Sequence, residues 1–145
     1  MITVRVQLEP FDPGVELVAL GTAGAVASFT GHVRADDGVA ILELEHYPGM
    51  TERALEDIAA QAADRWALSA VRVVHRVGRM QPGDAIVFVG AASAHRAAAL
   101  EACAYLIDRL KTDAPFWKRE SRANSDAASW VEPRAADDDA AARWD

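Results

Sequence analysis

Apolar and polar residues alternate at the start of the chain and then give way to a helical period. The alternation over residues 2–8 predicts a strand, because successive side chains of a strand point to opposite faces. Asp12 and Pro13 follow as a typical helix start, with a capping side chain and a proline in the first turn. They predict a short helix that ends at Gly21 and Gly24.

Two apolar segments then predict strands over residues 25–34 and 39–46, on either side of a loop at 36–38. Gly31 interrupts the first of these strands and predicts a β-bulge at that point.

A turn at Pro48 and Gly49 leads into a predicted helix, which Thr51 and Glu52 open with a hydroxyl and a carboxylate. The helical period places four apolar side chains on one face of it: Leu55, Ile58, Ala62 and Trp66. This face is expected to pack in the core.

The second half of the chain again alternates strands with a helix. Valines mark a strand over 71–77, and a turn at 81–84 precedes a buried strand over 85–92. Ser93 is expected to cap a long helix over 94–111. The predicted core face of that helix includes Leu100, Cys103, Ile107 and Leu110.

Pro115 prevents this helix from continuing. An extended segment is expected from Phe116, with a partner strand at residues 130–131 and a flexible loop over 122–129 between them. The tail after Arg134 is rich in alanine and aspartate, which predicts either a terminal helix or a frayed end.

Composition and charge agree with one globular domain. The chain has 145 residues, of which 51% are hydrophobic, enough for one core and too few for two. We therefore predict a single α+β domain over residues 1–145. No apolar run reaches the ~20 residues of a membrane span, and the N-terminus does not resemble a signal peptide. The expected location is cytoplasmic.

The formal charge of -7 argues against a general nucleic-acid partner, which would require a basic face. The charge is uneven, because residues 111–122 carry four cations against two carboxylates, whereas the chain from Asp137 onward is acidic. A local basic segment on an acidic protein suits a small anionic ligand better than a polymer.

Lysine occurs only twice, at Lys111 and Lys118, against thirteen arginines. An ammonium group can lose its proton when it is desolvated, whereas a guanidinium cannot. In a strand, Lys118 and Glu120 would share one face and Trp117 and Arg119 the other. An amine beside aromatic residues can have a lowered pKa and act as a base or nucleophile. Ordinary surface use of both lysines is the alternative.

His95 and Arg96 are expected in the first turn of the long helix, where the partial positive charge of the helix end disfavours cations. The pair is explained if an anion, above all a phosphate, binds there. The alternatives are that both side chains point to solvent or that His95 is a buried structural residue. Arg34 ends a predicted strand, and His32 on the same strand face could add a second donor.

The remaining histidines and the cysteine predict no metal site. His46 and His75 are interpreted as structural residues, and the spacing of the four histidines does not match metal ligands. Cys103 is interpreted as a small core residue and a poor nucleophile, and Phe29 as core rather than a platform for a ligand. The sequence contains no phosphate-binding loop, nucleophile elbow or dinucleotide fingerprint.

Seven segments occur in order along nearly the whole chain: F-T-G-H-V-R (29–34), L-E-H-Y-P-G-M-T (44–51), H-R-V-G (75–78), P-G-D-A-I-V-F-V-G (82–90), S-A-H-R (93–96), L-K-T-D-A-P-F-W-K-R-E (110–120) and W-V-E (130–132). With these segments the chain resembles the large, catalytic subunit of molybdopterin synthase. The resemblance implies an α/β hammerhead fold with additional antiparallel strands.

The resemblance also implies an activity and partners. Such enzymes convert cyclic pyranopterin monophosphate to molybdopterin by inserting two dithiolene sulfurs. The sulfur arrives as a thiocarboxylate on the C-terminal Gly-Gly tail of a small ubiquitin-like carrier subunit, which enters a pocket of the catalytic subunit. The catalytic subunit is expected to form a homodimer, giving a heterotetramer with one carrier at each end. No metal or organic cofactor is implied.

By the same resemblance, Lys118 is the lysine most important for catalysis, and Lys111 is a second catalytic lysine near the carrier tail. The residues implied in substrate binding are His32, Val33, Arg34, His95, Arg96, Lys111, Lys118, Arg119, Glu120 and Arg134. Arg96 is expected to enter the pocket of the neighbouring subunit. His32 stands where many relatives have lysine, so any charge there depends on pH.

Three other interpretations remain open from the sequence. The chain could be a non-catalytic module that binds a ubiquitin-like carrier or a phosphorylated ligand. It could be an unrelated α+β enzyme in which Lys118 forms a Schiff base with a phosphorylated metabolite. The last interpretation is a structural oligomer without a ligand.

Overall fold

The structure, a computed structural model, describes residues 1–122 and 128–145. In chain order its elements are β1 (Ile2–Gln7), α1 (Pro13–Ala19), β2 (Ala25–His32), the 3₁₀ helix η1 (Asp36–Gly38), β3 (Val39–His46), α2 (Met50–Trp66), β4 (Ala70–Arg76), β5 (Gly78–Met80), β6 (Ala85–Ser93), α3 (Arg96–Asp113), β7 (Phe116–Arg122), β8 (Ala128–Val131) and α4 (Ala135–Ala142). The predicted α+β class is confirmed.

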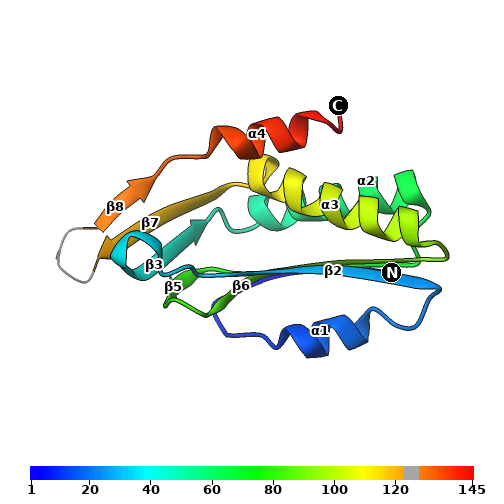
Figure 1. Cartoon of the computed structure of the whole chain (residues 1–145), viewed down its shortest axis with the longest axis horizontal. Helices are drawn as coiled ribbons and strands as arrows, with labels where there is room; N and C mark the ends of the chain where they lie inside the picture. Colours follow the sequence, from blue (N-terminus) through cyan, green and yellow to red (C-terminus); the bar gives the residue numbers. More distant parts are fainter. Residues whose placement is uncertain (123–127) are drawn as a thin grey trace.

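The strands form two four-stranded sheets. The first has the order β1-β4-β6-β2, with β1 parallel to β4 and the other two pairings antiparallel. The second has the order β5-β3-β7-β8 and is antiparallel throughout. Helices α2 and α3 cover one face of the first sheet and α1 lies on its other face, while α4 packs on α3 (Figure 1). Among the described residues, none of the helices is long and apolar enough to cross a membrane.

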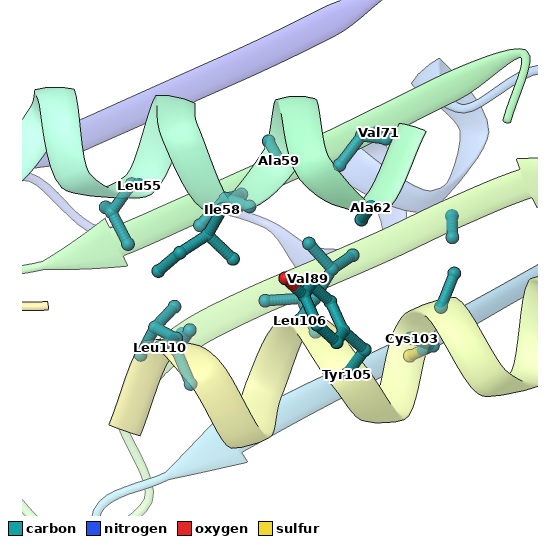
Figure 2. Close-up of a cluster of buried hydrophobic side chains, with 14 residues drawn as sticks. Leu55, Ile58, Ala59, Ala62, Val71, Val89, Cys103, Tyr105, Leu106 and Leu110 are labelled. Atoms are coloured by element: carbon teal, nitrogen blue, oxygen red, sulfur yellow. The ribbon is translucent and has the colours of Figure 1, made fainter. Parts of the chain in front are cut away.

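The main core lies between the first sheet and helices α2 and α3 (Figure 2). Leu55 and Ile58 of α2 and Leu106 of α3 are at most 5% exposed, and they pack on Val71 and Val89 of the sheet. The apolar face predicted for α2 is therefore confirmed. Burial along this interface holds the two helices on the sheet, because each apolar side chain removed from water stabilises the folded state by about 1.5–3 kcal/mol.

The start and the inward face of α3 differ from the sequence prediction. Ser93 belongs to β6 rather than capping the helix, and His95 is the residue that precedes the first helical turn. Leu100 is 62% exposed, whereas Ala99 and Leu106 are at most 1% exposed. Small alanine side chains such as Ala99 allow α3 to approach the sheet closely. The helix therefore turns its alanine face toward the sheet and Leu100 toward solvent. Hydrophobicity alone ranks leucine above alanine and could not predict this rotation.

Several local predictions are confirmed. The Asp12 carboxylate accepts a hydrogen bond from the Gly14 backbone N–H at 2.8 Å and so caps α1. The pairing of β2 with β6 shifts register between Gly31 and His32, where the bulge was predicted. Of the loop predicted over 122–129, residues 123–127 lie outside the described residues.

Residues at both ends of the predicted loop belong to strands, since Arg122 ends β7 and Ala128 begins β8. Of the two alternatives for the tail after Arg134, the helix is the one observed. Trp144 anchors the end of the chain: its indole N–H donates to Asp108 at 2.8 Å, and its ring packs edge-on against Trp66. This contact fastens the end of the chain, after α4, to helix α3.

A buried ion cluster fastens α1 to the first sheet. Glu16 of α1 is 4% exposed and accepts hydrogen bonds from the guanidinium groups of Arg5 and Arg72, the latter at 2.7 and 3.0 Å. Burial by itself raises the pKa of the Glu16 carboxyl. The hydrogen bonds and charges of Arg72 and Arg5 outweigh this effect and hold the pKa below its usual value.

The Glu16 cluster predicts a pH-dependent stability. A carboxyl whose pKa is lower in the folded than in the unfolded state stabilises the fold above its unfolded pKa, and this contribution is lost as the pH falls through the folded pKa. We expect Glu16→Gln to lower the unfolding free energy by about 2 kcal/mol at pH 7 and by less below about pH 4. Urea unfolding at both pH values measures this, with the exposed Glu9→Gln as control. A loss of the same size at both pH values would contradict the assignment.

Candidate active site

A cavity of about 870 Å³ opens where residues of both sheets meet the C-terminal end of α3. Its walls come from β2, β3, β7, β8 and the segment that joins β8 to α4. Leu42, Leu44 and Val87 contribute apolar surface to these walls, and charged side chains stand around them. The volume and the mixture of apolar surface with a few charged groups are typical of a site for a small molecule.

Both lysines of the chain line this cavity. Lys111 lies in the last turn of α3, and Lys118 lies on β7, beyond the break at Pro115. The register of the second sheet places Lys118 opposite Leu44 and Glu120 opposite Leu42, so these two polar side chains stand beside apolar neighbours of β3. The helix end and the strand start therefore bring the two amines to one site.

The surroundings of Lys118 make its amine more acidic. Burial lowers the pKa of the Lys118 ammonium, and the positive charge of Lys111 lowers it further. Arg134 and Arg34 act in the same direction, whereas the carboxylate of Asp137 opposes them. Although protein surrounds much of the side chain, Lys118 is still exposed to solvent through the open side of the cavity. Lys118 can thus lose its proton more readily than an ordinary lysine and still reach a ligand.

The end of β2 and the segment after β8 supply further residues to the cavity. His32, Val33 and Arg34 line it from one side, and Arg134 lines it from another. Val33 is buried, and its backbone N–H donates to the Asp84 carbonyl at 2.9 Å, which holds this corner of the chain in place. Arg34 is largely exposed, so its guanidinium is accessible to an anion from solvent.

Arg119 lies on the other face of β7 and does not line the cavity. Its guanidinium donates to Glu43 at 2.8 Å and to Glu45 at 3.1 Å, and it stacks over the Trp130 ring at 4.7 Å. Its Nε is buried and has no hydrogen-bond partner among the described residues. The structure therefore brings Glu120, but not Arg119, to the two lysines.

His95 and Arg96 lie at the opposite end of α3 from Lys111. Fifteen residues separate Arg96 from Lys111 along the helix, which corresponds to about 23 Å at 1.5 Å per residue. Neither His95 nor Arg96 lines the cavity, and both are exposed. One copy of the chain therefore does not bring these two residues to the lysines.

Two residues that the sequence predicts to be core or structural residues line the cavity. Phe29, interpreted as core, is 39% exposed and lines the cavity. His75, interpreted as a structural residue, is indeed buried, but it also lines the cavity. The valine-rich pattern of β4 predicts burial of His75 and contains no signal that a cavity adjoins it.

Other reactive groups contribute little to this site. Cys103 is buried in the main core, and burial raises the pKa of its thiol to about 11, so it is a poor nucleophile, as predicted. Within residues 1–122 and 128–145, no group of three or more His, Cys, Asp or Glu residues is arranged to hold a metal ion.

Fold and cavity together define an α+β protein with a cavity of the size of a small-molecule site, lined by a lysine amine of lowered pKa. The family described as MoaE protein matches residues 6–113. The molybdopterin synthase catalytic subunit of Pseudomonas aeruginosa is 52% identical, over 99% of each chain. This chain belongs to the MoaE protein family.

Solved structures agree with this assignment. The molybdopterin biosynthesis MoaE protein from Burkholderia ambifaria is 50% identical and superposes with a TM-score of 0.84, over 99% of this chain and 98% of that one. The molybdopterin synthase from Staphylococcus aureus is 32% identical with a TM-score of 0.79, over 88% of this chain and 95% of the other. The resemblance deduced from the seven sequence segments is confirmed.

Proposed function

We propose that this chain is the catalytic subunit of a molybdopterin synthase, acting in the cytoplasm as one domain over residues 1–145. It converts cyclic pyranopterin monophosphate to molybdopterin by inserting two sulfurs from the thiocarboxylated tail of a small ubiquitin-like carrier subunit. The family membership supports this assignment. The observation that carries it in the structure is the cavity in which Lys111 and Lys118 stand together.

The cavity offers a physical basis for the reaction. In each transfer the thiocarboxylate sulfur forms a bond to a side-chain carbon of the pterin as that carbon loses an oxygen substituent. Water then cleaves the acyl–sulfur bond, which leaves the sulfur on the substrate and releases the carrier as a carboxylate. We assign to Lys118 the proton transfer to the departing oxygen, because its lowered pKa makes the ammonium a better acid. We assign to Lys111 the binding of the carrier's terminal carboxylate.

Two copies of the chain would complete the phosphate site. Arg34 and Arg134 stand at the cavity of one copy. His95 and Arg96 are exposed about 23 Å along α3, so they can contact the same substrate only from a second copy. This supports a homodimer with one carrier bound at each cavity, which together form a heterotetramer. We include His32, Val33 and Glu120 in the substrate site on the basis of their position, and Arg119 only as a neighbour that supports β7.

Turnover with defined reagents tests the proposal. We expect the purified chain to form the dithiolene product from cyclic pyranopterin monophosphate and thiocarboxylated carrier, with two carriers consumed per product. The same carrier ending in an ordinary carboxylate is the matched control and should give no product. If a known synthase turns over these reagents and this chain only binds them, the chain is a non-catalytic binding module and the proposal is wrong.

A further inference from the structure

His75 of β4 occupies the wall of the cavity although nothing in the mechanism above uses it. Its side chain is 5% exposed and lines the cavity together with Phe116, whose ring stacks on the imidazole at a centroid distance of 3.9 Å and an angle of 17°. Phe116 lies two residues before Lys118 on β7. His75 is therefore held in a fixed orientation close to the reactive lysine.

One hydrogen bond determines which ring nitrogen carries the proton. Nδ1 lies 2.7 Å from the backbone carbonyl oxygen of Arg76. A carbonyl oxygen can only accept, so Nδ1 must be the protonated donor. Among the described residues, no group forms a hydrogen bond with Nε2. The nitrogen that remains available to the cavity is thus Nε2, a hydrogen-bond acceptor as long as the ring is neutral.

The ring is neutral at physiological pH. Burial is the main cause that lowers the pKa of His75 to about 4; the charges of Lys118 and Lys111 act in the same direction, and the hydrogen bond to Arg76 opposes them. The other charged groups that line the cavity are the cations Arg34 and Arg134 and the carboxylates of Asp36, Glu120, Glu132 and Asp137. His75 thus differs from the cations around it, because its Nε2 is an uncharged hydrogen-bond acceptor on a buried part of the cavity wall.

An uncharged acceptor and a set of cations select different parts of a ligand. A phosphate has acceptor oxygens and a negative charge, so it binds favourably to Arg34 and Arg134 and unfavourably to the Nε2 lone pair. A pterin ring carries N–H groups that can donate to such a lone pair. The two ends of a pterin monophosphate are therefore recognised at different places in the cavity.

We propose that His75 is a substrate-binding residue whose Nε2 accepts a hydrogen bond from an N–H or O–H group of the pterin. This bond orients the substrate with its phosphate toward Arg34 and Arg134. The inference deepens the proposed function and rests on it.

Two substitutions separate the cavity role of His75 from its role in the fold. In His75→Asn the amide N–H can take the place of Nδ1–H and keep the bond to the Arg76 carbonyl, while the acceptor toward the cavity is lost. In His75→Gln the amide oxygen can take the place of Nε2, while the bond to Arg76 is lost. The probe is cyclic pyranopterin monophosphate, with its Kd measured by calorimetry and its KM and kcat in the turnover assay, beside the Tm of each variant.

We expect His75→Asn to weaken substrate binding roughly tenfold, in both Kd and KM, with a Tm near that of the wild type. His75→Gln is expected to bind within roughly threefold of the wild type although its Tm is lower. The reverse order of binding would show a purely structural role and overturn the inference. So would equal binding by wild type and both variants, equal weakening in both, or a fall in kcat with KM unchanged.

Substrate binding and turnover by the wild-type protein show whether this inference alone fails or the proposed function fails as well. A wild type that neither binds nor converts the substrate overturns both. A wild type that does both, with His75→Asn equal to it, overturns only the role of His75.

Discussion

Replacing Lys118 by arginine is expected to reduce turnover by about 10²- to 10⁴-fold while leaving the fold intact. Arginine keeps the positive charge at the same place on β7, where the side chain is exposed to the cavity and has room for the larger group. A guanidinium cannot release a proton in a protein, whereas the pKa of the Lys118 amine is already lowered by burial and by Lys111. Loss of proton transfer is therefore the expected cause.

Comparison with Lys118→Met makes this prediction specific. Methionine removes both the charge and the titratable amine, so the two variants should lose turnover to a similar extent if proton transfer is the function of Lys118. If Lys118→Arg keeps most of the wild-type kcat and only Lys118→Met loses it, the residue acts as a fixed charge. Single-turnover rates with saturating thiocarboxylated carrier, together with circular dichroism spectra of each variant, distinguish these outcomes.

A mixed dimer of Arg96→Ala and Lys118→Ala subunits is expected to have about half the wild-type activity, although each variant alone should lose at least about 100-fold. Arg96 lies about 23 Å along α3 from Lys111 in the same chain, so we propose that it serves the cavity of the other subunit. In the mixed dimer one cavity then combines the intact Lys118 of the first subunit with the intact Arg96 of the second. The other cavity lacks both groups.

The matched control uses two residues of one cavity. Arg34 and Lys118 line the same cavity within one chain, so a mixed dimer of Arg34→Ala and Lys118→Ala subunits has a defect in both cavities and should remain inactive. Each mixed dimer can be isolated by placing a different affinity tag on each subunit. Recovery of activity by the control pair, or no recovery by the Arg96 pair, would show that Arg96 does not act across the dimer.

The sequence predicts some residues of the candidate active site and misses others. Lys111 and Lys118 are conspicuous because lysine is otherwise absent from the chain, and strand alternation correctly separates Glu120 from Arg119. His75 and Phe29 were interpreted as structural or core residues, because an apolar strand pattern predicts burial and does not show whether a cavity adjoins the buried face.

By itself the sequence determined the secondary structure and the family of this protein. The strands, the Asp12 cap of α1, the bulge at Gly31 and the break at Pro115 depend on residues close together in the chain, so local patterns were sufficient to predict them. The seven segments were specific enough to identify the MoaE family.

Only the tertiary structure decided which of these residues share a site. It places the end of α3, one side of β7 and the corner after β2 around one cavity. It turns Arg119 toward Glu43 and leaves Arg96 far from the lysines. It also buries Ala99 in place of Leu100 on α3. These outcomes depend on the packing of segments distant in sequence, where shape and close approach decide the contacts and a hydrophobic pattern along the chain does not.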